Sequence, residues 1–182
     1  SLGESAMRDS ARFHFGFTVP FVPHFSAQAA VEAVANSKGD LALVSATSSR
    51  APWWLALEAD GAPKIIARLP FIERADHPAA LPVFVVSRVA DDARVTEVET
   101  WSVRVSGWNA DTAHALSPLA EIVAVPDAAF DGAALLVSVT KDIGFEAIKT
   151  ALFEAGASVR STALVGSHAT RYTMPSSAAA RP

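Results

Sequence analysis

Apolar and polar positions divide the first half of the chain into two helices followed by short strands. Residues 4–15 and 27–36 repeat apolar side chains at helical spacing, and Ser26 is suited to cap the second helix. Three apolar runs then predict strands, at residues 41–45, 63–71 and 81–89. The first of these runs is continuous rather than alternating, which is typical of a strand buried in a parallel sheet. The second helix and this strand would form half of a β-α-β unit, whose first strand is missing or is supplied by Val19 to Val22.

The pattern changes after the charged stretch at residues 90–94, where a second unit begins. Its clearest helix covers residues 142–156, with Gly156 just past the end and four side chains turned inward: Ile143, Ile148, Ala151 and Leu152. The remaining segments are an alternating strand, a capped helix, two strands joined by a turn and a closing hairpin-like pair, at residues 96–107, 109–121, 122–127, 132–140, 158–166 and 169–175. The order β-α-β-β-α-β with one extra strand resembles a ferredoxin-like sandwich.

These elements predict an α/β chain of the α+β kind with two subdomains. A small βαβ-type subdomain is expected at residues 3–90 and a ferredoxin-like subdomain at residues 95–175, followed by a disordered tail at residues 176–182. The chain has 182 residues, of which 51% are hydrophobic and 19% are charged, so apolar material suffices for a packed core.

Composition and motifs exclude several classes of function. The net charge of −4 provides no overall field for a polyanion, so nucleic acid is not an expected partner. No apolar run approaches the roughly 18 residues that a membrane helix needs, no signal peptide is visible and no cysteine is present. We therefore expect a cytoplasmic protein without disulfides. The five histidines lack the spacing of a metal site, and no nucleotide-binding or GxSxG motif occurs, so we expect no metal and no cofactor.

The stretch SATSSRAPWW, residues 45–54, is the first candidate for a binding site. Its hydroxyl groups belong to Ser45, Thr47, Ser48 and Ser49, and together with backbone N–H groups they are suited to bind a carboxylate. Arg50 can bind the same group with both arms of its guanidinium, and Trp53 can stack on a ring. The pattern is also typical of a helix start, in which Ser48 or Ser49 is the cap and one indole fills the core. Spacing alone favours this second interpretation.

Arg68 is the second candidate, because it interrupts the apolar strand IIARLPF. A charged side chain is rarely buried unless it is paired. Arg68 therefore either points into a cleft, where it meets an anionic ligand, or forms an ion pair with an acid such as Glu73. The ion pair is the favoured interpretation.

Residues 5–90 resemble the first subdomain of the prephenate dehydratases. The resemblance rests on the run from SARFHFG to VEAVANSKGDLALVSATSS, and on PKIIARLPF and PVFVVSR after it. The pairing of WW with the IIARLPF strand is similar to the dehydratase-like region that follows the helical segment of some bacterial chorismate mutases. The later run VTKDIGFEAIKTALFEAGASVRSTALVGS resembles an ACT module, the unit with which prephenate dehydratases sense phenylalanine.

The catalytic motifs of that family are replaced in this chain. The family's Glu-Asn-Ser falls on residues 47–49, where only the serine is kept. Its Thr-Arg-Phe falls on residues 82–84, where only Phe84 agrees and proline and valine replace the threonine and the arginine. Dehydration needs a proton donor for the leaving hydroxyl and a cation for the ring carboxylate, and both are absent at these positions. The Glu-Ser-Arg-Pro effector motif of the ACT module is not visible either.

The resemblance therefore implies a catalytically degenerate prephenate dehydratase-like module in aromatic amino-acid (phenylalanine) biosynthesis. We expect it to bind a small aromatic or prephenate-like carboxylate, or to support a chorismate mutase segment as its partner. If Arg50 holds the carboxylate, Arg50→Ala weakens binding by about 1.5–3 kcal/mol. Two alternatives stay open. One is an active dehydratase that converts prephenate to phenylpyruvate, and the other is a ligand-free structural domain that forms a homodimer through an edge strand of its second half.

Overall fold

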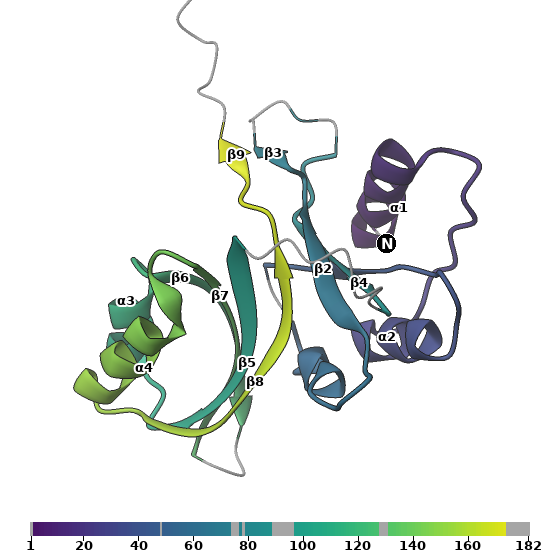
Figure 1. Cartoon of the computed structure of the whole chain (residues 1–182). Helices are drawn as coiled ribbons and strands as arrows, with labels where there is room; N and C mark the ends of the chain where they lie inside the picture. Colours follow the sequence, from purple (N-terminus) through teal and green to yellow (C-terminus); the bar gives the residue numbers. More distant parts are fainter. Residues whose placement is uncertain are drawn as a thin grey trace, which may run out of the picture.

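The computed structural model describes residues 2–47, 49–73, 77, 79–88, 97–127 and 131–173 (Figure 1). Within these ranges the chain forms four α-helices: α1 (Leu2–Phe15), α2 (Ala27–Ala35), α3 (Ala110–Leu116) and α4 (Gly144–Glu154). The strands are β1 (Ala42–Ser45), β2 (Lys64–Leu69), β3 (Ile72–Glu73), β4 (Val83–Ser87), β5 (Val98–Ser106), β6 (Ala120–Asp127), β7 (Gly132–Thr140), β8 (Ser158–His168) and β9 (Tyr172–Thr173), and a 3₁₀ helix, η1 (Trp53–Leu57), follows β1. The expected mixture of helices and strands is confirmed. The predicted boundary near residue 92 and the predicted tail lie outside the described residues.

Seven of the strands form one mixed sheet in the order β1-β4-β2-β8-β5-β7-β6. Neighbouring strands are antiparallel except β2 and β8, which run parallel and pair at Ile65 and Gly166. This contact requires glycine, because a Cβ atom at residue 166 would lie 2.2 Å from the carbonyl oxygen of Ile65. The strands of the first and second halves of the chain therefore belong to a single sheet.

β1 lies at one end of this sheet and runs antiparallel to β4, so the predicted parallel strand of a β-α-β unit is wrong. Residues 19–22 form no strand either. β1 is nevertheless apolar along its length, because helices cover both of its faces. Val44 belongs to the core that includes α2 and η1, and Leu43 packs in the cluster that includes side chains of α1.

The ends of the helices follow local capping signals. The Ser26 hydroxyl accepts a hydrogen bond from the Ala29 N–H at 3.1 Å, as its position before α2 predicts. Gly156 has a φ of 85° just past α4, the left-handed conformation that ends a helix. The prediction that Ile143 faces inward is wrong: this residue precedes α4 and is 37% exposed. The helix predicted at residues 109–121 ends at Leu116, and β6 begins soon after it.

Residues 98–168 run in the order β5-α3-β6-β7-α4-β8, with the strands arranged β8-β5-β7-β6. Figure 1 shows α3 and α4 packed side by side on one face of these strands. Val103, Leu135 and Ile148 are buried together there, and Trp101 stacks on Phe145 with ring centroids 4.2 Å apart. This layer buries one face of the second half of the sheet.

The opposite face of the same strands packs against the first half of the chain. Leu136 and Val165 belong to one buried core with Trp53, Trp54 and Leu57 of η1. The two indole rings meet edge to face, with centroids 5.9 Å apart. The two halves are therefore joined by a shared core as well as by the pairing of β2 with β8.

Residues 158–173 do not fold back on themselves as predicted. β8 extends to His168, and β9 pairs in parallel with β3 in a separate two-stranded sheet, so the predicted hairpin-like pair is wrong. This pairing brings Arg171 and Glu73 together beside the larger sheet. No helix in the described part of the chain is long and apolar enough to cross a membrane.

Candidate functional site

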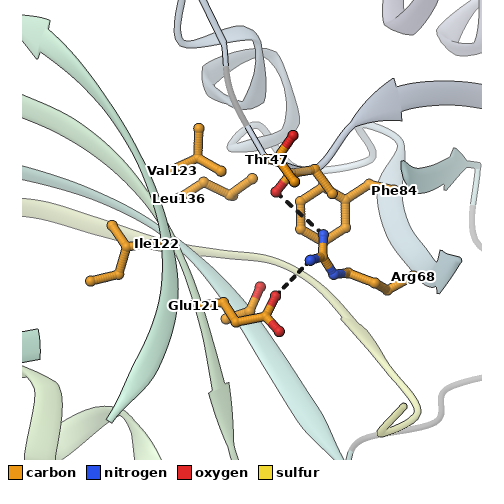
Figure 2. A pocket seen from close by; sticks show the side chains of 9 residues that line it. Thr47, Arg68, Phe84, Glu121, Ile122, Val123 and Leu136 are labelled. Atoms are coloured by element: carbon orange, nitrogen blue, oxygen red, sulfur yellow. Dashed lines mark hydrogen bonds and ion pairs between the residues drawn. The ribbon is translucent and has the colours of Figure 1, made fainter. Parts of the chain in front are cut away.

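A cavity of about 280 Å³ lies between the two halves of the chain, on the face of the sheet opposite α3 and α4 (Figure 2). Its lining comes from the turn after β1, from β2 and β4, and from β6 and β7: Ala46, Thr47, Arg68, Phe84, Glu121, Ile122, Val123, Leu136 and Ser138. Most of these side chains are apolar, and the charged ones are Arg68 and Glu121. The cavity therefore combines an apolar wall with one ion pair.

Arg68 is held from several sides. Its Nη2 atom lies 2.8 Å from Oε2 of Glu121, and its Nη1 donates a long hydrogen bond of 3.3 Å to the carbonyl oxygen of Ala46. The guanidinium carbon lies 5.0 Å from the centre of the Phe84 ring. Burial lowers the pKa of Arg68, and the carboxylate of Glu121 opposes this effect. Arg68 thus both points toward a cavity and forms an ion pair, but with Glu121 rather than with the predicted Glu73.

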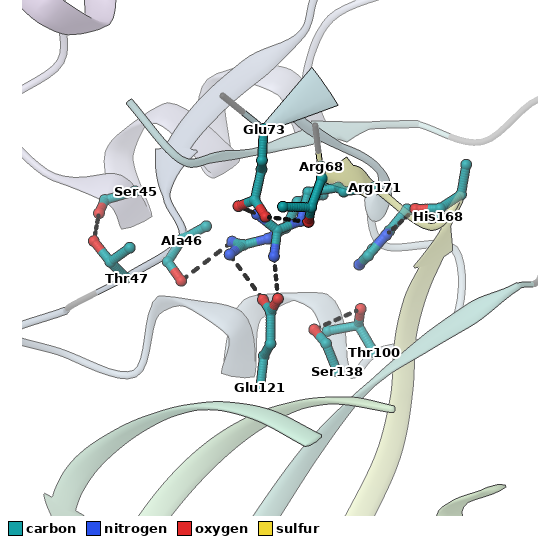
Figure 3. Close-up of polar contacts among 12 residues, drawn as sticks. Ser45, Ala46, Thr47, Arg68, Glu73, Thr100, Glu121, Ser138, His168 and Arg171 are labelled. Atoms are coloured by element: carbon teal, nitrogen blue, oxygen red, sulfur yellow. Dashed lines mark hydrogen bonds and ion pairs between the residues drawn. The ribbon is translucent and has the colours of Figure 1, made fainter. Parts of the chain in front are cut away.

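Glu121 is shared between two arginines (Figure 3). Its Oε2 binds Arg68, and its Oε1 accepts from Nη2 of Arg171. Arg171 also binds Glu73 through Nη1. The four side chains form a network of two positive and two negative charges, which joins β2, β3 and β6 to the segment before β9.

Neutral polar side chains continue the site along β5, β7 and β8. The hydroxyl oxygens of Thr100 and Ser138 lie 3.3 Å apart, and both residues are buried. The ring centroid of His168 lies 6.1 Å from that of Phe84, and its Nδ1 atom is 2.8 Å from the carbonyl oxygen of Ala169. Burial lowers the pKa of His168, so the imidazole is neutral in the folded protein near pH 7.

The structure separates the residues of the SATSSRAPWW stretch. Thr47 lines the cavity, and its hydroxyl lies 3.4 Å from that of Ser45. Ser49 bonds within its own turn, to the backbone of Ala51. Arg50 is exposed and is not part of the cavity lining. Ser48 lies outside the described residues.

Trp53 is buried in the core and does not line the cavity. It starts η1, and the residue that precedes this helix is Pro52, without a side-chain cap. The interpretation of an indole that fills the core is therefore confirmed, whereas the predicted cap by a serine at residue 49 is not formed. Of the predicted site residues, Thr47 and Arg68 are brought together at the cavity.

Sequence reasoning did not identify Glu121, Ser138 or Arg171 as members of the site. Ser138 carried a weak signal, because it is a hydroxyl residue within the apolar run GAALLVSVT. Glu121 and Arg171 have no such signal in their own segments. Their place becomes visible only through the pairing of β6 with β7 and of β9 with β3.

A second, wider hollow of about 1130 Å³ lies between α1, residues 16–25, α2 and β1. Its walls are largely apolar, and Phe17, Val22 and Phe25 on the connecting segment are mostly exposed. The described residues contain no group of three or more histidine or acidic side chains that could hold a metal ion. Arg12, His24 and Asp40 are among the residues that line this hollow, whereas the Arg68 cavity places a buried cation and its ion pair in the lining.

In chemical terms, the Arg68 cavity offers a fixed cation, the face of an aromatic ring, apolar walls and the hydroxyl groups of Thr47 and Ser138. Such a set can orient a small anion with an apolar body. The chain matches no protein-family model, no curated protein and no solved structure.

Proposed function

We propose that this chain is a catalytically degenerate module, similar to prephenate dehydratase and linked to aromatic amino-acid metabolism, that binds a small aromatic carboxylate beside Arg68. The observation that carries the proposal is the buried guanidinium of Arg68, which lies over the Phe84 ring at the wall of a cavity. A carboxylate is the natural partner of a guanidinium, because two parallel N–H···O bonds match its two oxygens.

The rest of the lining suits the body of such a ligand. Phe84, Val123 and Leu136 offer apolar surface to a ring, and Thr47 offers a hydroxyl group. Residues 47 and 84 are also the positions onto which two motifs of the dehydratase family fall, and both line the cavity. This coincidence supports the family resemblance for the first half of the chain.

Binding without dehydration is the activity that these residues favour. Proline and valine stand at residues 82 and 83, where the family's threonine and arginine would act. Glu121 is the acid of the cavity lining, and it contacts Arg171 as well as Arg68, so the described lining contains no carboxyl group without an arginine partner. We therefore do not assign a catalytic residue.

The proposal also includes the fold of each half of the chain. Residues 98–168 would be a ferredoxin-like, ACT-like unit, and the strand order β8-β5-β7-β6 with both helices on one face supports it. The strands before residue 90 would be a reduced dehydratase-like subdomain. The continuous sheet and the shared core mean that neither unit has a fully separate interior.

Thermal unfolding in the presence of phenylpyruvate, phenylalanine, tyrosine, tryptophan, chorismate and prephenate tests the proposal. At least one compound should raise Tm, because a ligand that binds only the folded state stabilises it. Incubation with prephenate should yield no phenylpyruvate above the uncatalysed rate. If no compound shifts Tm, or if phenylpyruvate accumulates, the proposal fails.

Two variants locate the site by calorimetric titration with the compound that binds. Arg68→Lys keeps the charge but loses the planar fork, and should weaken binding by about 1.5–3 kcal/mol. Arg50→Ala serves as the matched control, since Arg50 is exposed and outside the lining, and should leave the affinity unchanged. The reverse pattern would assign binding to the SATSSRAPWW surface instead.

A ligand-free oligomerising domain, or one that supports a chorismate mutase segment, is the second candidate. It is favoured by the exposed Val19, Val22 and Phe25, which line the hollow next to the end strand β1, and by the position of β6 at the other end of the sheet. Sedimentation velocity over a wide range of concentrations tests self-association. A monomer at every concentration would contradict the dimer.

A further inference from the structure

We propose that Glu121 is an internal carboxylate that occupies the ligand's place on Arg68, and that a monocarboxylate with a compact aromatic body displaces it. The inference rests on the proposed carboxylate-binding function and specifies its ligand class and its regulation. It follows from four properties of the Arg68–Glu121 pair and its surroundings.

The first property is an asymmetry in exposure. The Arg68 side chain is 5% exposed, whereas the Glu121 side chain is 50% exposed. Arg68 is fixed from the protein interior by the Phe84 ring and the Ala46 carbonyl. Glu121 belongs to β6, the end strand of the sheet, and solvent reaches it. The acidic partner can therefore move away into water while the guanidinium stays in place.

The second property is the alternative partner of Glu121. Its Oε1 atom already accepts from Arg171, which lies on a different segment from Arg68. When Glu121 leaves Arg68, it keeps this ion pair and does not become an isolated carboxylate. Arg171 in turn keeps Glu73. The displacement thus exchanges one carboxylate for another on Arg68, while Arg171 continues to contact both Glu121 and Glu73.

The third property is the bonding capacity of Arg68 itself. Its bond to Ala46 is long, at 3.3 Å, and its Nε atom has no hydrogen-bond partner in the part of the chain that the structure describes. The bond to Glu121 engages Nη2. A free carboxylate that is not tethered to β6 can reorient to engage two N–H groups of the fork.

The fourth property is the charge and size of the cavity. Its lining carries one positive side chain, Arg68, and one negative side chain, Glu121. A second carboxylate on the ligand would meet the displaced Glu121 and apolar walls, without a second cation in the lining. The volume of about 280 Å³ lies just below the range typical of pockets for drug-sized ligands. Both features favour a ligand with a single carboxylate and a single ring.

Two probes that differ by one carboxylate test this inference: 3-phenylpropionate and benzylmalonate, titrated calorimetrically at pH 7.5. The wild-type protein should bind 3-phenylpropionate at least about 5-fold more tightly than benzylmalonate. Glu121→Gln removes the competing charge, so it should bind 3-phenylpropionate about 10-fold more tightly than wild type and should discriminate less between the two probes. Glu146→Gln is the matched control, because Glu146 forms an exposed ion pair with Lys149 on α4, on the other face of the sheet.

The outcomes separate this inference from the function on which it rests. Binding of 3-phenylpropionate that is equal or weaker in Glu121→Gln overturns the displacement but keeps a carboxylate site. Tighter binding of benzylmalonate by the wild type overturns the ligand class. Binding of neither probe to either protein overturns both the displacement and the proposed function. If Glu121→Gln does not fold, Glu121→Asp, with its shorter side chain, takes its place and should show the same direction of change.

Discussion

At the scale of single residues, the balance of burial and charge at Arg68 determines which partner of the ion pair the fold depends on. Arg68 is buried and Glu121 is half exposed. Removal of the exposed partner therefore leaves a buried cation, whereas removal of the buried partner leaves a half-exposed carboxylate that still contacts Arg171.

We expect Glu121→Ala to lower the free energy of unfolding by about 1–3 kcal/mol, because it deprives a buried guanidinium of its counter-charge. Arg68→Met, which keeps an apolar stem over Phe84, should change it by less than about 1 kcal/mol. Urea unfolding of both variants and of the double variant measures this difference, and the double variant should be more stable than Glu121→Ala alone. A larger loss for Arg68→Met would mean that the stacking on Phe84, rather than the charge, dominates.

The buried His168 leads to a prediction of how the stability of the fold depends on pH. Burial lowers its pKa in the folded state, and burial together with the neighbouring His77 lowers that of His14 on α1. Below the unfolded pKa of about 6.5, the unfolded chain takes up protons that the folded state binds less readily, so stability falls as the pH falls.

The urea midpoint should therefore decrease from pH 7.5 to pH 5.5, and His168→Gln should make this decrease shallower. His114→Gln is a suitable control, because His114 is exposed on α3. Identical pH profiles for wild type and His168→Gln would show that the imidazole is protonated equally well in both states.

At the scale of elements, α3 illustrates how a local signal can determine where a helix starts. Asn109 accepts hydrogen bonds from the N–H groups of Asp111 and Thr112, and the Thr112 hydroxyl accepts one from the N–H of Asn109. Asn109→Ala should cost about 0.5–2 kcal/mol in chemical unfolding, whereas Asn109→Asp should retain most of the stability, because a carboxylate accepts the same bonds near a helix N-terminus. An equal loss in both variants would contradict the capping role.

Capping residues and helical spacing predicted α1, α2 and α4 well, because each signal lies within the helix or next to it. Strand pairing was less predictable, and β1 shows why. A continuous apolar run indicates that both faces are covered, but not what covers them. Here α2 and η1 cover one face and α1 the other, so an antiparallel end strand carries the pattern of a central parallel one.

The candidate site also contains residues that could be predicted from the sequence and residues that could not. Arg68 could be identified because a charge within an apolar strand is unusual, whereas its true partner could not. Glu73 lies five residues from Arg68 in the sequence. Glu121 instead lies on β6, an end strand of the sheet that is separated from β2 by three other strands, and it reaches Arg68 from there. Arg50 and Trp53 met the chemical requirements of a carboxylate and ring site, yet the turn after β1 directs one to solvent and the other to the core.

At the scale of the whole molecule, the two halves of the chain depend on each other. The core around η1 includes Trp53 and Trp54 from the first half and Leu136 and Val165 from the second. The cavity likewise takes Arg68 from one half and Glu121 from the other. We therefore expect a single cooperative unfolding transition for the described body of the protein, and a ligand that tightens the cavity should stabilise both halves together.

Gly166→Ala tests this mutual dependence at the point where the halves pair. The new Cβ would lie 2.2 Å from the carbonyl oxygen and 2.6 Å from the backbone nitrogen of Ile65, and neither backbone atom can move without separating β2 from β8. We expect a loss of about 3 kcal/mol or more, loss of ligand binding, and a transition that broadens or splits in two. Tryptophan fluorescence reports on both halves, through Trp53 and Trp54 in the shared core and Trp101 and Trp108 in the second half, and amide circular dichroism reports on the whole sheet. Ser167→Ala, a similar change at the next residue, should unfold in one transition near the wild-type midpoint. If Gly166→Ala does the same, the shared core alone holds the halves together and the β2–β8 contact is dispensable.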